Sequence, residues 1–193
     1  HVHNDTGCAV ANTIAAVDAG ARQIQGTVNG YGERTGNANL LTCAANLQLK
    51  CGFDVIPEES LAKLESVSRR ISELVNIAPF PREPYVGDSA FAHKAGLHAS
   101  AIRVDPDLYQ HIDPATVGNG MRMLVSEMAG KSSIELKAEE LGIDLESLPN
   151  AAARIAVKVK EREAAGYTYD AADASFELLA LNELGRLPRF LRV

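Results

Sequence analysis

A strand, a helix and a second strand follow one another within the first 28 residues, and this succession restricts the fold more than any other feature. Residues 1–3 alternate as at the end of a strand. The alanine-rich segment 7–20 has apolar side chains at helical spacing and ends on a glycine, and residues 22–28 are typical of a short strand. This order predicts a parallel crossover unit of an α/β fold.

The rest of the chain is predicted to be mainly helical. A glycine-rich loop at 29–37 precedes a helix at 38–50, and residues 58–76 form an amphipathic helix with one apolar face. That face carries Leu61, Leu64, Val67, Ile71, Leu74 and Val75. Further helices are expected at about 131–141, 147–165 and 171–185.

Prolines at 79, 81 and 84 interrupt the helical pattern and indicate a domain boundary. We therefore expect an α/β segment at 1–80 and a linker subdomain of loops and short helices at 81–130. Residues 131–193 are expected to form a helical subdomain. The predicted fold class is an α/β segment followed by a mainly α-helical region.

Composition argues against several classes of protein. Hydrophobic residues make up 46% of the chain and charged residues 23%, as in soluble globular proteins. The net charge of −6, without a basic stretch, argues against binding to nucleic acid or to anionic membrane surfaces. No apolar run reaches the length of about 18 residues that a transmembrane helix needs. The odd cysteine count (Cys8, Cys43 and Cys51) predicts reduced, buried thiols in a cytosolic protein.

His1 and His3 are candidate metal ligands, because side chains two positions apart on a strand face the same way. The alternative is an artefact of the N-terminus or the remnant of a tag.

The glycine-rich loop adds a carboxylate at Glu33 and an amide oxygen at Asn37, and it leaves the next strand of the crossover. Loops that follow neighbouring parallel strands lie side by side, so this loop should meet the histidine pair. The alternative for the loop is a hairpin turn at Asn29 and Gly30.

A third polar cluster contains His93 and His98 with Lys94 between them. Histidine suits general acid–base chemistry near neutral pH. The alternative is that both histidines are helix-surface or capping residues.

Three segments together resemble the isopropylmalate/homocitrate/citramalate synthases, which are TIM-barrel enzymes. They are 1–7 (HVHNDTG), 26–39 (GTVNGYGERTGNAN) and 89–98 (SAFAHKAGLH), and they occur in order. The citramalate branch is the most similar, through segments 84–93, 109–114, 124–132 and 174–178. The resemblance implies that the first 80 residues are the last βα units of a TIM barrel.

The resemblance also implies site residues. His1 and His3 match two metal-ligating histidines at the end of the seventh barrel strand, and Asn37 matches a further ligand after the eighth. Glu33 matches a carboxylate that lines the substrate site. His93 and Tyr109 match, respectively, a histidine that helps to deprotonate acetyl-CoA and a tyrosine that reaches the partner subunit's active site.

The reaction implied is a Claisen condensation that uses a divalent metal ion (Mg, Mn or Zn). Acetyl-CoA would condense with a 2-oxo acid, pyruvate being favoured, in branched-chain amino-acid biosynthesis by a cytoplasmic homodimer. The metal polarises the ketone, a base removes a proton from the acetyl methyl group, and thioester hydrolysis releases CoA.

The chain departs from the family in one respect. The family's first strand, with an Arg, an Asp metal ligand and a Glu, has no counterpart, and the chain starts with His rather than Met. Residues 181–190 are similar to the lead into a regulatory domain that we do not find. We therefore expect the C-terminal part of a catalytic region, which alone binds metal weakly and is inactive.

Three alternatives stay open. The 2-oxo acid could be that of 2-isopropylmalate or homocitrate synthase. A lyase of the same barrel group is less well supported, because the segment around His93 and the helical linker favour a synthase. A non-catalytic helical dimerisation module at 88–185 is the alternative of another class.

Overall fold

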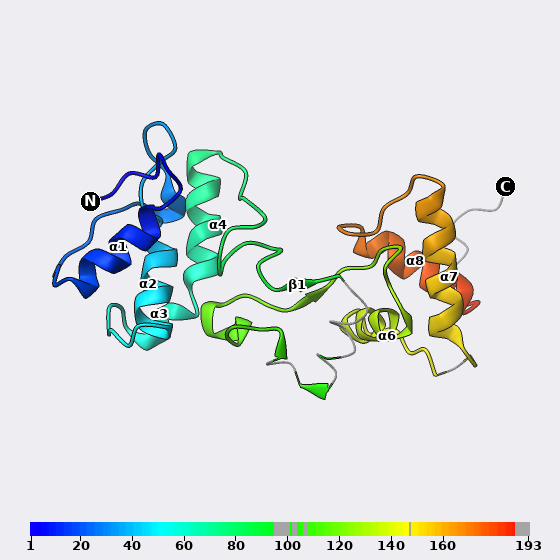
Figure 1. Cartoon of the computed structure of the whole chain (residues 1–193). Helices are drawn as coiled ribbons and strands as arrows, with labels where there is room; N and C mark the ends of the chain where they lie inside the picture. The colour runs from blue at the N-terminus through cyan, green and yellow to red at the C-terminus, as the bar shows by residue number, and fades with distance from the viewer. Residues whose placement is uncertain (95–100, 102–103, 106–107, 147, 188–193) are drawn as a thin grey trace. The chain divides into compact units, whose positions relative to one another are not determined.

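The computed structural model describes residues 1–94, 101, 104, 105, 108–146 and 148–187, and Figure 1 shows its elements. The chain forms two compact units, which we describe separately. Unit 1 comprises His1–Phe91 and Ile112–Gly120, and unit 2 comprises Ala92–His111 and Met121–Val193. The subdomain boundaries at 80 and 130 stay a prediction.

Unit 1 is built from short helices joined by loops (Figure 1). They are α1 (Ala9–Asp18), the 3₁₀ turn η1 (Val28–Gly30), α2 (Leu40–Leu49), α3 (Glu58–Leu61), α4 (Leu64–Val75) and the 3₁₀ turn η3 (Pro114–Val117). The predicted helices at 7–20 and 38–50 are confirmed as α1 and α2. Helix α2 begins at Asn39, whose side chain accepts a hydrogen bond from the Leu41 N–H as an N-cap.

The predicted helix at 58–76 is two helices, α3 and α4. They are separated at Ala62 and Lys63. Gly118, at the C-terminal end of η3, packs against this break. A Cβ at Gly118 would lie 2.2 Å from the Ala62 carbonyl oxygen. A distant segment thus packs against the break, a contact that helical periodicity cannot reveal.

The two strands predicted in unit 1 are not formed as ladders. Segment 1–3 makes one antiparallel bridge, His3 to Asn37, and segment 22–28 makes one parallel bridge, Thr27 to Asn39. A strand needs hydrogen-bonded neighbours along its length, and the part of the chain that the structure describes supplies only these single bridges. The predicted parallel sheet at the start of the chain is therefore not formed among the described residues.

The face of α4 that packs against unit 1 also differs from the prediction. Val67, Leu74 and Val75 are exposed, whereas Ser68 and Ser72 are buried. The main core of the unit lies elsewhere, between α2, the start of α4, η3 and the chain from 85 to 91. Its buried residues are Leu41, Ala45, Leu61, Leu64, Tyr85, Val86, Phe91 and Val117.

All three cysteines are free thiols, but only Cys43 is buried; Cys8 and Cys51 are exposed, contrary to the prediction. Burial raises the pKa of the Cys43 thiol, against a smaller lowering by its hydrogen bond with Thr13.

Among its described residues, unit 2 contains a short parallel strand pair and the helices α6, α7 and α8 (Figure 1). The pair joins β1 (Ala92–His93) to β2 (Arg122–Met123), with His93 opposite Met123. The helices are α6 (Lys131–Glu140), α7 (Ala151–Ala164) and α8 (Asp173–Glu183), which confirm the three predicted helices. Ile134, Ile155, Val159 and Phe176 lie at the centre of their core.

Lys137 is the only lysine in the described part of unit 2 that is fully buried, with 1% of its side chain exposed. Its Nζ lies 2.8 Å from Glu140 Oε1 and 2.9 Å from Asp173 Oδ1. Arg122 Nη2 lies 3.1 Å from the other oxygen of Asp173, and the Met123 N–H donates to Glu140 Oε2. These contacts connect β2, α6 and α8.

The pKa of Asp173 reflects this arrangement. Burial raises it, but hydrogen bonds and charges of Lys137 and Arg122 together outweigh burial and hold it below the ordinary value.

No helix in the described residues is long and apolar enough to cross a membrane.

We predict that Lys137→Met lowers the free energy of unfolding by about 3 kcal/mol, because it leaves two carboxylates without their buried cation. The two carboxylates are about one third exposed. The expected loss of stability therefore lies at the low end of what removal of one partner from a buried ion pair costs. Urea unfolding followed by circular dichroism measures the change. Lys158→Met is the matched control, since Lys158 makes the same i,i+3 pair with Glu161 on an exposed surface and should change stability little. Equal losses in both variants would contradict the prediction.

Candidate active site

The first segment and the glycine-rich loop lie side by side in unit 1. The His3–Asn37 bridge is flanked by two backbone hydrogen bonds, from Asn4 N to Gly36 O (2.9 Å) and from Ala38 N to Val2 O (3.0 Å). The loop does not form a hairpin at Asn29 and Gly30; instead it makes the turn η1 and leads into α2. The expected neighbourhood of the two motifs is therefore present, although the contact is antiparallel.

The two candidate histidine ligands lie close together on an open surface. The ring centroids of His1 and His3 are 5.0 Å apart, with the ring planes at 75°. Both side chains are exposed. Two neighbouring imidazoles can supply two nitrogen donors to one divalent ion.

Asn37 has one satisfied and one unsatisfied side-chain atom. Its Nδ2 donates to the Tyr31 carbonyl oxygen at 3.1 Å. Its Oδ1 is buried and has no hydrogen-bond partner among the described residues. Leaving a buried acceptor unsatisfied costs about 1–3 kcal/mol, so such an atom calls for an explanation.

The types of donor suit a divalent ion, because an amide oxygen without a hydrogen bond can act as a ligand and two imidazoles lie in the adjoining segment. The set is incomplete in one respect. No group of three His, Cys, Asp or Glu side chains that could hold a metal occurs among the described residues.

Glu33 lies at the tip of the loop, in a turn closed by the hydrogen bond from Gly36 N to Glu33 O. Its side chain is 86% exposed, and Arg34 Nη1 lies 3.8 Å from Glu33 Oε2. The carboxylate is therefore accessible to a ligand at the surface of the loop.

An ion pair between Asp5 and Arg34 was missed by the sequence analysis. Arg34 Nε and Nη2 donate to the two carboxylate oxygens of Asp5 at 2.7 and 2.9 Å. This hydrogen bonding makes the largest contribution to the lowered pKa of Asp5. The opposite charges of the two neighbouring motifs were a signal for this contact, which ties the loop to the segment of His1 and His3.

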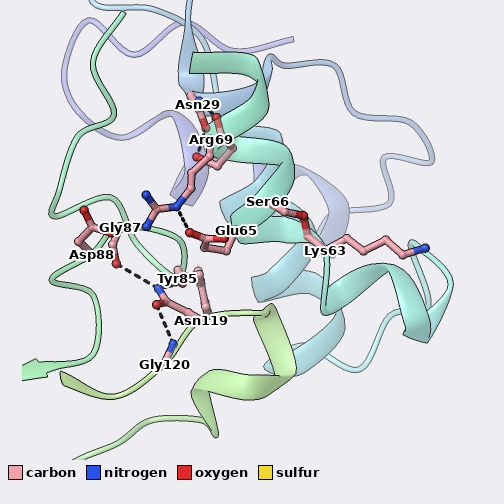
Figure 2. Close-up of polar contacts among 11 residues, drawn as sticks. Asn29, Lys63, Glu65, Ser66, Arg69, Tyr85, Gly87, Asp88, Asn119 and Gly120 are labelled. Atoms are coloured by element: carbon pink, nitrogen blue, oxygen red, sulfur yellow. Dashed lines mark hydrogen bonds and ion pairs between the residues drawn. The ribbon is translucent and has the colours of Figure 1, made fainter. Parts of the chain in front are cut away.

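Asn29 anchors the loop to α4 (Figure 2). Its backbone is in the left-handed region, with φ 61°, which asparagine tolerates better than most residues. Its Nδ2 donates to Ser68 O and Ser72 Oγ, both at 3.0 Å, and its Oδ1 accepts from Ser68 Oγ at 2.7 Å. No local pattern of residues predicts this contact, because the partners are 39 and 43 positions apart.

A second network holds the chain that leads toward the His93 motif. Asn119 Nδ2 donates to the carbonyl oxygens of Tyr85 (2.9 Å) and Gly87 (3.0 Å), as Figure 2 shows. Arg69 of α4 pairs with Glu65 and with Asp88 in the same view. Segment 85–88 is thus fixed on unit 1 from two sides.

The remaining candidate residues belong to unit 2. His93 is the second residue of β1, and its carbonyl oxygen accepts from Leu124 N at 2.8 Å. The alternative of a helix-surface or helix-capping residue is therefore wrong for His93. Tyr109 is 41% exposed. His98 lies outside the described residues.

Comparison with known proteins gives matches along most of the chain. The HMGL-like family matches residues 1–71, and the family described as homocitrate synthase post-HMGL domain-like matches residues 85–166. The (R)-citramalate synthase of Streptomyces coelicolor is 62% identical over 100% of this chain and 36% of the relative.

Other relatives align in the same way. The (R)-citramalate synthase of Aquifex aeolicus is 50% identical over 96% of this chain and 35% of its own length. A probable 2-isopropylmalate synthase of Methanopyrus kandleri is 40% identical over 75% of this chain and 29% of its own length. The chain thus spans about a third of the length of the curated relatives it matches.

We predict that Arg34→Gln raises the pKa of Asp5 toward the ordinary value of about 3.9. The folded pKa of Asp5 lies below the unfolded value, so the contribution of the pair to stability is complete above about pH 3.9 and is lost as the pH falls through the lowered pKa. An NMR titration of the Asp5 carboxyl carbon measures the midpoint. Arg70→Gln, which removes the exposed partner of Glu73, is the control and should leave that midpoint unchanged. An unshifted midpoint in Arg34→Gln would show that another group lowers the pKa.

Proposed function

Because this chain belongs to the isopropylmalate/homocitrate/citramalate synthase family, we propose that it takes part in the metal-dependent condensation of acetyl-CoA with a 2-oxo acid. The observation that carries the proposal is the buried, unsatisfied Oδ1 of Asn37 in a loop paired with the segment of His1 and His3. These donors occur in the part of the chain that the HMGL-like family matches.

We propose pyruvate as the 2-oxo acid and citramalate as the product. Support comes from relatives named (R)-citramalate synthase that align with the whole chain at 62% and 47% identity. Relatives named 2-isopropylmalate and homocitrate synthase align with 75% and 76% of it at 40% identity.

His1, His3 and Asn37 are the proposed metal ligands in this chain, and the ion is Mg²⁺, Mn²⁺ or Zn²⁺. When bound, the ion supplies a Lewis acid for the ketone of the 2-oxo acid. A carboxylate ligand would complete this set, since imidazole and amide donors leave the charge of a divalent ion uncompensated.

His93 is proposed to help remove a proton from the methyl group of acetyl-CoA. The electron pair released from the C–H bond forms a carbon–carbon bond with the ketone carbon of the 2-oxo acid, and the ketone oxygen takes up a proton. Water then cleaves the thioester and releases CoA. Glu33 is proposed to line the 2-oxo acid site, and its high exposure leaves it able to do so.

We propose a homodimer in which Tyr109 reaches the active site of the partner subunit. Exposed apolar side chains on unit 2, such as Val157 of α7 and Leu178 of α8, support association through its helices. They also favour the second candidate, a non-catalytic dimerisation module.

The free thiols support placing the reaction in the cytoplasm, where it would serve branched-chain amino-acid biosynthesis.

The reaction can be tested in a full-length hybrid in which this chain replaces the matching part of the Streptomyces coelicolor relative. We predict that CoA release, followed with a thiol reagent, is faster with pyruvate than with longer 2-oxo acids. His93→Gln should lower kcat about 100-fold or more, as expected for loss of a general acid–base group. Glu59→Gln, an exposed carboxylate of α3, is the control.

A preference for a longer 2-oxo acid would reassign the substrate to that of a 2-isopropylmalate or homocitrate synthase. A hybrid that folds but releases no CoA with any 2-oxo acid would favour the dimerisation module.

We predict that the 193-residue chain alone binds Mn²⁺ or Zn²⁺ weakly and releases no CoA, because its donors lack a carboxylate. Isothermal titration calorimetry of the chain and of the hybrid measures the difference. Tight, stoichiometric binding by the chain alone would contradict this incomplete ligand set.

A further inference from the structure

The orientation of the Asn37 amide is decided by a single contact. Its NH₂ group faces the Tyr31 carbonyl oxygen at 3.1 Å. A carbonyl oxygen can only accept hydrogen bonds, so a flipped amide would place two acceptors against each other. The Tyr31 carbonyl therefore turns Oδ1 toward the opposite side, where it is buried and has no hydrogen-bond partner among the described residues.

The Tyr31 carbonyl is itself held from two directions. Thr27 Oγ1 donates to the same oxygen, at 2.5 Å. At the other end of the residue, the phenol oxygen lies 3.1 Å from Ser72 Oγ of α4. The position of the backbone at Tyr31 thus depends on a helix that is 41 positions away in the sequence.

Asn29 reinforces the same link. Its amide bridges the loop to both buried serines of α4, Ser68 and Ser72. Ser72 is 1% exposed and Ser68 is 5% exposed, so these hydrogen bonds are shielded from competing water. The buried face of α4 therefore carries hydroxyl groups that match the polar atoms of the loop.

Gly32 leaves the space that the amide needs. A Cβ at this position would lie 2.2 Å from Asn37 Nδ2, and the backbone has φ +155°. Any side chain would displace the NH₂ group from its place, or the loop would have to move.

We propose that Tyr31, Asn29 and Ser72 are positioning residues that present the Asn37 amide oxygen to the metal ion. The inference rests on the proposed metal role of Asn37 and extends it to residues that touch neither metal nor substrate. Partners that orient a metal ligand in this way typically contribute about 10- to 100-fold to metal affinity.

The test uses the full-length hybrid and Co²⁺ as the probe, because its visible absorption reports the geometry of its ligands. Tyr31→Phe removes one oxygen atom, and Ser72→Ala removes its partner. Each is expected to weaken Co²⁺ binding about 10-fold and to alter the Co²⁺ spectrum. Ser66→Ala is the matched control on the same helix, since Ser66 is exposed and its Oγ donates only to Lys63 O (Figure 2).

A double-mutant cycle separates positioning from simple stabilisation. In the Asn37→Ala background, Ser72→Ala should change Co²⁺ affinity no further, because the ligand that it orients is gone. Urea unfolding of the metal-free proteins runs in parallel. A lower unfolding free energy for Tyr31→Phe and Ser72→Ala with unchanged Co²⁺ affinity and spectrum would overturn the inference.

Failure of the proposed function gives a different result. If the parent hybrid binds no Co²⁺, the metal role of Asn37 is wrong and the positioning role falls with it. Another outcome is that the parent binds Co²⁺ while Tyr31→Phe and Ser72→Ala keep the same Co²⁺ affinity and spectrum as the control Ser66→Ala. In that case the proposed function stands and the inference alone is overturned.

Discussion

The contact between His3 and Asn37 is the constraint on which the candidate site of unit 1 depends. It brings a segment from the start of the chain against a loop whose conformation is otherwise set by α4. The Asp5–Arg34 ion pair holds the same two pieces at their exposed edge. Neither piece has regular secondary structure at this point, so two backbone hydrogen bonds and the Asp5–Arg34 pair take the place of the ladder that usually fixes neighbouring strands.

Unit 2 places His93 by a comparable device. The strand β1 is only two residues long, which is too short to be stable without support. Its partner β2 is fixed by Arg122 and by the Met123 N–H, which contact the two carboxylates around Lys137. The buried charge cluster thus holds the strand pair, and the strand pair holds the backbone of His93.

The helices could be predicted from the sequence because their signals are local. Apolar spacing and glycines located α1, α2, α6, α7 and α8, with ends displaced by a few residues. The neighbourhood of His1, His3 and Asn37 followed from the order of the motifs. The strands could not be predicted, since a ladder depends on neighbours elsewhere in the chain. The amphipathic pattern of α4 failed to show that Ser68 and Ser72 face inward, because their partners lie in a distant loop.

The inward-facing serines of α4 have a consequence for how this chain can drift in evolution. Alanine is a better helix former than serine by about 0.5 kcal/mol, so mutation toward alanine at Ser68 or Ser72 would favour the helix itself. The loop, through Asn29 and Tyr31, opposes that drift. A helix position that looks freely exchangeable is thereby coupled to the loop, and each can change only together with the other.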